Sequence, residues 1–187
     1  MAYQQLGQAS QVVSEQLQQL LAHSNAIKSL EMNTHDVLLE QQQQQNYAYF
    51  VQSGVLVAAY LDEQGQQHYK EFYFQGELAF MYSAWITQQP ANYSLEVLKP
   101  SRLLRVPLAE LAQPRWHSLT MALLQQQVLF KESKEAFLLL QSPQQRYQFL
   151  LTHRPHWLAQ LSLTQVAKYL GISAVSLSRI RARLGLN

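Results

Sequence analysis

The end of the chain, residues 163–187, combines a helical apolar pattern with three closely spaced arginines. Arg179, Arg181 and Arg183 stand at every second position, and no acidic residue follows Glu135. Each guanidinium group presents a planar set of donors, which matches phosphate oxygens and the edge of a guanine base. The residue types therefore predict recognition of an anion, and the elements that carry them indicate which anion it is.

The charge of the chain is divided unevenly. The 187 residues hold 14 Lys and Arg and 12 Asp and Glu, a formal net charge of +2. From residue 141 onward there are six bases and no acid, a charge of +6, so the remaining eight bases and twelve acids carry −4. Such asymmetry is typical of a basic module that binds nucleic acid or an acidic membrane surface.

Two short helices are predicted to carry this basic end. Ser162 and Gln165 have the spacing of a capping box at the start of the first helix, and Gly171 can end it in a left-handed conformation. Ser173 is placed to cap the second helix. At 100° per residue, the second helix turns one apolar stripe inward. Its members are Leu177, Ile180 and Leu184, which face Val166, Leu170 and Ile172 of the preceding segment.

The opposite stripe of the second helix is exposed in this arrangement and consists of Val175, Ser178, Arg179 and Ala182, bordered by Ser176, Arg181 and Arg183. A short stripe with one planar donor between flanking cations fits the major groove of double-stranded DNA better than a membrane surface, which needs a large apolar face. We expect Arg179 to bind a guanine edge and Val175 to touch a thymine methyl group. The predicted DNA-binding residues are Thr164, Lys168, Ser173, Val175, Ser176, Ser178, Arg179 and Arg183.

The middle of the chain has a different period. Residues 37–106 consist of short β-rich runs separated by Gly54, the stretch DEQG, Gly76 and Pro100, which predicts a rolled antiparallel sheet with a hairpin at 62–65. The first thirty residues have helical spacing and predict one or two short amphipathic helices. The five glutamines at 41–45 are expected to form a solvated loop or strand edge.

A long helix is predicted from Trp116 to Gln141, ended by Ser142 and Pro143. It carries two apolar rows, one of Trp116, Leu119, Leu123, Phe130, Phe137 and Leu140 and one of Met121, Leu124 and Val128. One row can pack on the β-roll and the other on a second copy of the chain, so a homodimer is expected. The alternative is that both rows are buried within one chain.

The order of these parts resembles the Crp/Fnr family of bacterial transcription regulators, from NYAYFVQSG through GELA to the stretch ending in SLSRIR, and most strongly over residues 142–184. The resemblance implies an α+β fold: N-terminal helices with a β-roll sensor domain (a double-stranded β-helix of the cyclic nucleotide-binding type) over 1–113, a long dimerisation helix over 114–141, and a helix-turn-helix domain without the family's β-wing over 142–187. It also implies four partners: a palindromic DNA site, a second copy of the chain, RNA polymerase and a small-molecule effector. Ser178 and Arg179 match the family's DNA-reading pair, whereas Val175 stands where many members carry glutamate.

The stretch Gly76–Ala79 resembles the start of the family's phosphate-binding cassette, in which Glu77 would accept a hydrogen bond from a ribose hydroxyl. The arginine expected later in the cassette is absent, and residues 90–94 read PANYS instead. A buried cyclic phosphate would then be uncompensated, so weak or no cyclic AMP binding is expected. Tyr82, Trp85 and Tyr93 can line a pocket for a less charged ligand or simply fill the core. The candidate pocket residues are Gly76, Glu77, Leu78, Ala79, Tyr82, Asn92, Tyr93 and Ser94.

Several classes of protein are disfavoured. The chain has no cysteine, which excludes disulfides, thiolate metal sites and cysteine nucleophiles. None of the six histidines forms an H-x-H pair in the β-rich region, so we expect no metal, no cofactor and no enzymatic activity. Neither a signal peptide nor a membrane-spanning stretch is apparent, which predicts a cytoplasmic protein without a membrane partner. Two alternatives stay open, a cupin-like metal enzyme and a protein-interaction module whose basic end binds an acidic protein.

Overall fold

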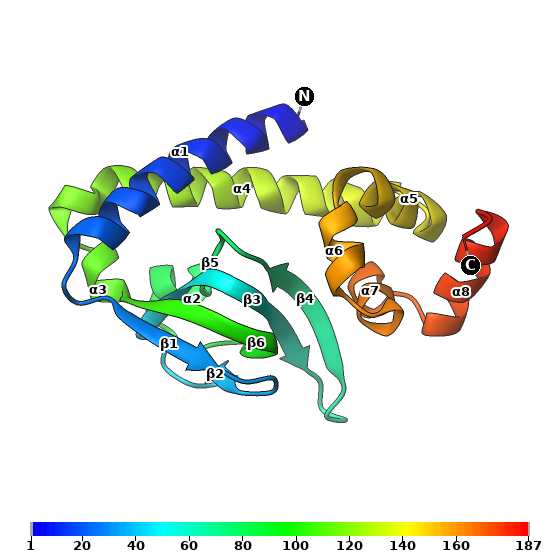
Figure 1. The fold of residues 1–187 in the computed structure, drawn as a ribbon, viewed down its shortest axis with the longest axis horizontal. Coiled ribbons are helices and arrows are strands. Elements are labelled where there is room, and N and C mark those ends of the chain that lie inside the picture. Colours follow the sequence, from blue (N-terminus) through cyan, green and yellow to red (C-terminus); the bar gives the residue numbers. More distant parts are fainter. Residues whose placement is uncertain (1, 187) are drawn as a thin grey trace. The chain divides into compact units, whose positions relative to one another are not determined.

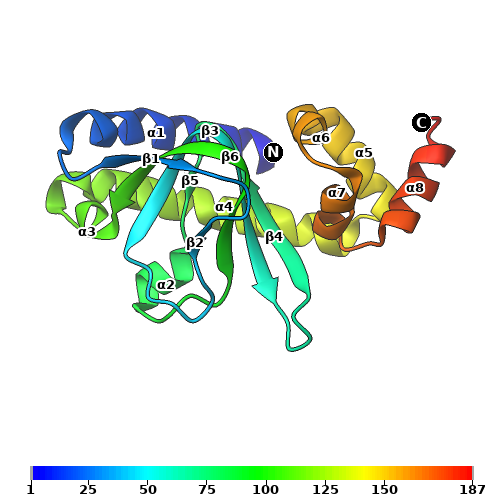
Figure 2. The same cartoon turned by 60° about the horizontal axis from the view of Figure 1, so that its bottom comes forward.

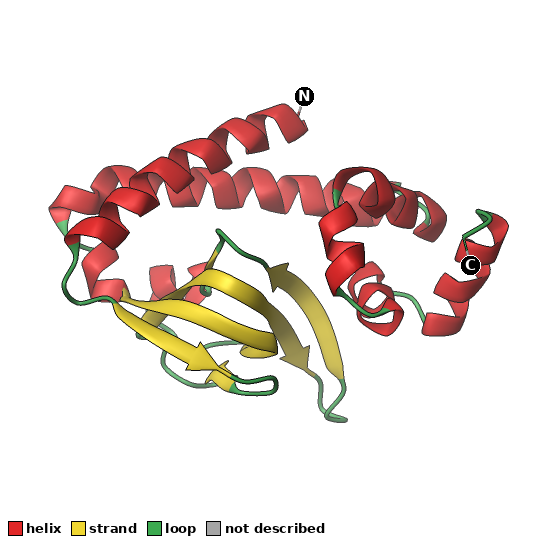
Figure 3. Cartoon of the chain, in the orientation of Figure 1, coloured by secondary structure: helices red, strands yellow, loops and turns green. Residues whose placement is uncertain are grey.

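The computed structural model describes residues 2–186, with side chains described from residue 9 onward, and divides into two compact units that meet within a long helix, between Phe130 and Lys131. Helices and strands are distinguished in Figure 3. The first unit contains α1 (Ala2–His23), β1 (Lys28–Met32), β2 (Val37–Leu39), β3 (Tyr47–Leu61), β4 (Gln67–Tyr73), β5 (Leu78–Ala79), α2 (Tyr82–Thr87), β6 (Ser94–Pro107), α3 (Leu108–Leu111), a 3₁₀ turn (Pro114–Trp116) and the start of α4 (His117–Leu140). The second contains the rest of α4 and α5 (Pro143–His153), α6 (Pro155–Gln160), α7 (Leu163–Leu170) and α8 (Ala174–Arg183).

The sheet of the first unit is antiparallel throughout and is built around two long strands, β3 and β6 (Figures 1 and 2). The strand order is β1-β6-β3-β4, while β2 also pairs with β6 and β5 also pairs with β3. The hairpin predicted at 62–65 is confirmed, since the Gly65 N–H donates to the Asp62 carbonyl at 3.0 Å between β3 and β4. The predicted rolled antiparallel sheet is therefore confirmed, and β1 adds a strand that the sequence analysis did not predict.

The expectation that Gly54 and Pro100 end separate strands is wrong, because β3 and β6 run through these positions with 15 and 14 residues. Gly54 has φ +96°, and a Cβ atom there would lie 2.1 Å from the Ser101 Oγ and 2.5 Å from the Pro100 carbonyl oxygen. The register of β3 against β6 shifts on both sides of Gly54. Glycine and proline thus bend two paired strands at one level, which lets each strand continue around the roll.

The glutamine tract at 41–45 forms a loop between β2 and β3, as expected, and Gln42, Gln43 and Gln44 are exposed, but its two end residues brace the first unit. The buried Gln45 amide accepts from the Met81 N–H at 2.6 Å and donates to the Met81 carbonyl at 3.0 Å. The Gln41 side chain bonds the N–H and carbonyl of Leu61 in the same way. Side-chain amides therefore replace a missing strand partner, a role that composition alone cannot reveal.

Replacing Gln45 with leucine is expected to lower the free energy of unfolding by about 1–3 kcal/mol, because the polar groups of Met81, which is 1% exposed, would lose their partners. Urea denaturation followed by circular dichroism measures the loss. Gln44→Leu is the matched control, since Gln44 is exposed and should change stability by less than about 0.5 kcal/mol. Equal effects of the two substitutions would show that the Gln45 bonds contribute nothing.

The N-terminal segment forms one helix, α1, of 22 residues, rather than two short ones. Its apolar residues Val13, Leu17 and Leu20 are buried in a cluster with Leu119 and Leu123 of α4, so the row of α4 that contains Leu119 and Leu123 is the one that packs within the chain here. The helices lie side by side here (Figures 1 and 2). The amide of Gln16 also donates to the Ser118 hydroxyl at 3.0 Å. One face of α4 is therefore covered within the chain.

The outer row of α4 is not covered in the described chain, residues 2–186. Met121 and Val128 are 43% and 57% exposed, and Leu124 is half-buried. Near the end of the helix Phe137 is buried against Phe149 of α5, whereas Leu140, of the same predicted row, is 81% exposed. The predicted helix bounds are confirmed to within one residue.

The second unit packs α5 to α8 around its own apolar core, which includes Tyr147, Trp157, Leu170 and Leu177. The sequence pattern predicts α7 and α8 but assigns no helix to residues 143–160, where the structure has α5 and α6. Ser142 begins α5 with a capping box completed by Gln145, and Pro155 stands in the first turn of α6. Within residues 2–186, no helix has both the length and the apolar content needed to cross a bilayer.

Candidate nucleic-acid interface

The two C-terminal helices begin and end where the sequence predicts. The Ser162 Oγ accepts from the Gln165 N–H at 3.3 Å while the Gln165 Oε1 accepts from the Ser162 N–H at 2.7 Å, so the capping box of α7 is confirmed. Gly171 ends α7 with φ 69°. The Ser173 Oγ caps α8 by accepting from the Ser176 N–H at 3.1 Å. These local signals fix the turn between α7 and α8 and hence the direction of α8.

The faces of α8 separate as predicted. Leu177 is fully buried and Ile180 is 7% exposed, while Val175 is 61% exposed. Ser178 and Arg179 are exposed on the same side as Val175, because residues three and four apart share a helix face. The second unit therefore presents a short stripe with one apolar, one hydroxyl and one guanidinium side chain.

The six bases of residues 141–187 differ in exposure, three being half-buried and three exposed. Three make contacts within the second unit: the Arg146 Nη1 donates to the Leu170 carbonyl at 2.6 Å, the Arg181 Nη1 donates to the Tyr147 hydroxyl at 2.8 Å, and the Arg154 guanidinium lies 5.7 Å from the centre of the Trp157 ring. The expected place of Arg181 beside the outer stripe is thus corrected, because its guanidinium joins α8 to α5. The exposed bases are Lys168, Arg179 and Arg183.

The other predicted DNA-binding residues differ in how available their hydroxyl groups are. Thr164 is exposed in the first turn of α7. Ser178 is exposed in the second turn of α8. The hydroxyls of Ser173 and Ser176 lie 2.9 Å apart and are engaged with each other at the cap of α8. Ser173 and Ser176 therefore already serve the start of the helix, whereas Thr164 and Ser178 face solvent.

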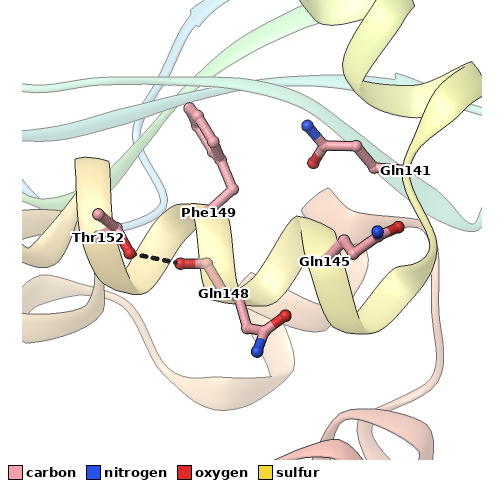
Figure 4. Close-up of a pocket in the computed structure, with 5 residues that line it drawn as sticks. All are labelled: Gln141, Gln145, Gln148, Phe149 and Thr152. Carbon is pink, nitrogen blue, oxygen red and sulfur yellow. Dashed lines mark hydrogen bonds between the residues drawn. The ribbon is translucent and has the colours of Figure 1, made fainter.

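An open groove of about 310 Å³ lies along one face of α5 in the second unit (Figure 4). The side chains that line it are Gln141, Gln145, Gln148, Phe149 and Thr152. Within it the Thr152 hydroxyl donates to the Gln148 carbonyl at 3.1 Å. The lining carries no formal charge, so it differs in chemistry from the basic stripe of α8.

In the first unit, the predicted pocket residues of the GELA stretch have structural contacts. The Glu77 Oε2 accepts from the Phe74 N–H at 2.9 Å and closes the turn in which Gly76 has φ 89°. Leu78 and Ala79 are buried in β5, which pairs with β3. The Glu77 carboxylate therefore stabilises the turn in which it lies. A family pattern alone does not reveal this contact.

The remaining pocket candidates lie around the start of β6 and in α2. Tyr93 is 5% exposed in the core of the roll, and the Ser94 hydroxyl donates to the Ala59 carbonyl at 3.1 Å. The ring of Tyr82 lies 4.2 Å from that of Phe80, in the cluster that also includes residues of α1 and α4. Asn92 is exposed. These aromatic side chains pack against the core, which was the second of the two roles expected for them.

Burial changes the ionisation of three tyrosines in the roll. Burial raises the pKa of the Tyr82 and Tyr93 hydroxyls, and it raises the pKa of Tyr73, to which Tyr93 and Glu71 also contribute. A raised tyrosine pKa means that the surroundings stabilise the neutral form over the anion. These hydroxyls therefore stay protonated and remain hydrogen-bond donors.

Lys70 is a basic residue beside Tyr93, one of the predicted pocket residues, and its place there is not apparent from the sequence. Its Nζ lies 4.7 Å from the centre of the Tyr93 ring. A β-bulge pairs Glu71 with Ala58 and Tyr69 with Ala59, so Lys70 has no opposite residue in β3. Because a bulge breaks the alternation of faces along a strand, the pattern of residues could not locate this side chain.

Comparison with known proteins agrees with this geometry. Residues 30–113 match the family model of the cyclic nucleotide-binding domain. FixK2 from Bradyrhizobium japonicum has a similar structure, with a TM-score of 0.72 and 15% identity over 85% of this chain and 84% of that chain. For CLP from Xanthomonas campestris the TM-score is 0.65, with 14% identity over 92% and 91% of the two chains. For the catabolite activator protein of Thermus thermophilus it is 0.52, with 18% identity over 91% and 83%. Among curated proteins, no sequence matches this chain.

The β-roll thus resembles a cyclic nucleotide-binding domain in sequence and in fold, and the α+β chain continues into a C-terminal helix-turn-helix formed by α7 and α8. Roll, long helix and helix pair together have the fold of the Crp/Fnr-type transcription regulators, which confirms the fold expected from the sequence. Identities of 14–18% support a shared fold only. The chemistry of this protein must be inferred from its own residues.

Proposed function

We propose that the protein is a homodimeric, sequence-specific DNA-binding transcription regulator. The observation that carries the proposal is the outer face of α8, on which Val175, Ser178 and Arg179 are exposed opposite the buried Leu177 and Ile180. A helix of this kind can enter the major groove, where an arginine can donate two hydrogen bonds to guanine. The chain has no acidic residue after Glu135, so phosphate repulsion does not oppose this approach.

Supporting phosphate contacts are assigned to the exposed groups around that face. Lys168 and Thr164 of α7 and Arg183 of α8 are exposed. Contacts of lysine, arginine and threonine with phosphates fix the position of a recognition helix without reading sequence. Arg179, Ser178 and Val175 then read the bases, and Ser173 and Ser176 contribute mainly by capping α8.

The second copy of the chain is proposed to cover the outer row of α4. Met121 and Val128 are exposed at a separation of seven residues, the spacing of one coiled-coil seam. A two-fold pair of chains would present two α8 helices to two half-sites, so the operator is expected to be a palindrome. RNA polymerase is the further partner expected of such a regulator, and cytoplasmic location follows from access to DNA.

Selection of bound fragments from genomic or randomised duplex DNA tests this function. We expect enrichment of a palindromic site with a guanine in each half, about one helical turn between half-site centres. Binding without enrichment would favour the alternative, a basic module that binds any polyanion or an acidic protein. Catalytic turnover with a bound metal would favour the other alternative, a cupin-like enzyme.

Cyclic AMP is expected to bind weakly or not at all to the purified protein. The arginine of the cassette is absent and Glu77 is engaged at its own turn, so a buried phosphate would lack the guanidinium group that compensates its charge. The penalty of several kcal/mol for an uncompensated buried charge weakens affinity by about a thousandfold or more. Isothermal titration would contradict this expectation by showing micromolar affinity. The fold accommodates other effectors, since CLP is described as responsive to c-di-GMP.

A further inference from the structure

The valine at the start of α8 has an exposure that folding does not explain. Val175 is 61% exposed in the first turn of the helix, where it buries little apolar surface. Valine is also a poorer helix former than alanine, so it gives α8 no local advantage. The neighbouring Ser173 and Ser176 are occupied by the cap, with their hydroxyls 2.9 Å apart. Val175 is therefore the side chain of the first turn that is left to meet a ligand.

The position of Val175 relative to Arg179 defines which bases it would meet. The two residues are four apart on one helix face, which separates them by about 6 Å along the axis. Base pairs are stacked at roughly 3.4 Å, so the two side chains would contact base pairs one or two steps apart. Val175 lies in the first turn of α8 (Ala174–Arg183), the part of a recognition helix that contacts base edges, and Arg179 lies one turn further along, near the middle of the helix.

The chemistry of valine selects one group in the major groove. Its two methyl groups neither donate nor accept hydrogen bonds, and the C5-methyl group of thymine is the apolar group that base edges present there. A carboxylate at this position would instead accept from the N4 amino group of cytosine. No acidic residue occurs in residues 136–187, so no side chain of the basic end can supply that acceptor.

We infer that Val175 reads the C5-methyl group of a pyrimidine close to the guanine bound by Arg179, and that it accepts this methyl group on 5-methylcytosine as well as on thymine. The two bases carry the methyl group on the same ring atom and differ at C4, where valine makes no polar contact. The inference rests on the proposed DNA-binding function and adds to it a specificity for methylated pyrimidines at one position of each half-site.

The test uses the full chain and the duplex recovered by selection. Each thymine pair of the symmetric half-sites is replaced in turn by deoxyuridine, by cytosine and by 5-methylcytosine, with guanine opposite the two cytosines, and affinity is measured by fluorescence anisotropy. At one position, removal of the methyl group is expected to weaken binding about fourfold per half-site, or roughly fifteenfold for both, as burial of one methyl-sized group implies. At that position 5-methylcytosine should bind better than cytosine by a similar factor.

Variants show whether a preference for methylated pyrimidines comes from Val175 or from the rest of the protein. Val175→Ala should abolish the effect of the methyl group, while Val175→Glu should reverse the preference towards unmethylated cytosine. Val37→Ala is the matched control, because Val37 is 47% exposed on β2 and should keep the methyl preference. If the protein binds selectively but no deoxyuridine substitution changes its affinity, the inference about Val175 is wrong. The same holds if the methyl effect persists in Val175→Ala. In both cases the proposed function still stands. Absence of any selective binding overturns the proposed function and the inference with it.

Discussion

Arg179→Ala is expected to weaken binding to the selected duplex by about 1–3 kcal/mol in each half-site, or roughly thirtyfold or more for the dimer. The exposed guanidinium of Arg179 makes no contact that α8 needs, so the variant should fold normally. The loss should vanish on a duplex in which the contacted guanine is already replaced, because no hydrogen bond is then left to lose. Fluorescence anisotropy on the four combinations of protein and duplex measures this coupling.

Arg181→Ala is the matched control for Arg179→Ala, since the two arginines lie on the same helix and only Arg181 donates to the Tyr147 hydroxyl, at 2.8 Å. Its substitution is expected to lower the stability of the second unit by about 0.5–1.5 kcal/mol and to leave base preference unchanged. If Arg181→Ala altered base preference and Arg179→Ala did not, the assignment of the reading face of α8 would be wrong.

Gly54→Ala is expected to destabilise the β-roll by about 3–6 kcal/mol, enough to unfold a domain of ordinary stability. Two costs combine at this position. The backbone has φ +96°, which non-glycine residues rarely adopt, and the added Cβ would lie 2.1 Å from the Ser101 Oγ and 2.5 Å from a backbone oxygen of Pro100. Urea denaturation and the yield of soluble protein report the effect.

Gly65→Ala provides the comparison, because Gly65 also has a positive φ, +76°, but no atom lies within 4 Å of its missing Cβ. The substitution then causes only backbone strain, so the free energy of unfolding should fall by only about 1–2 kcal/mol. A similar loss at both glycines would mean that the close approach of β3 and β6 at Gly54 is relieved by a small shift of Ser101 and Pro100.

The C-terminal helices could be predicted in detail because their signals are local. Ser162, Gln165, Gly171 and Ser173 fix where α7 and α8 begin and end, and a period of 3.6 residues separates their faces. The stripe around Arg179 followed from these signals alone. What they could not reveal was the partner of Arg181, because Tyr147 lies 34 residues earlier in the chain.

The roll was less predictable because its decisive contacts are non-local. Gly54 was interpreted as the end of a strand, since glycine usually interrupts one, yet it permits β3 to cross Ser101 closely. The bonds from Gln45 to Met81 span 36 residues and give no local pattern. Lys70 was missed for a related reason, as a bulge removes the alternation from which its direction could be inferred.

The most direct test of the central claim is the ratio of two affinities, for the selected palindromic duplex and for a scrambled duplex of the same composition, measured by anisotropy at several salt concentrations. We expect the selected duplex to bind about a thousandfold or more tightly, with both affinities falling as salt rises because the exposed bases release counterions from the phosphates. Equal affinities for the two duplexes at every salt concentration would contradict the claim that the exposed face of α8 reads a DNA sequence.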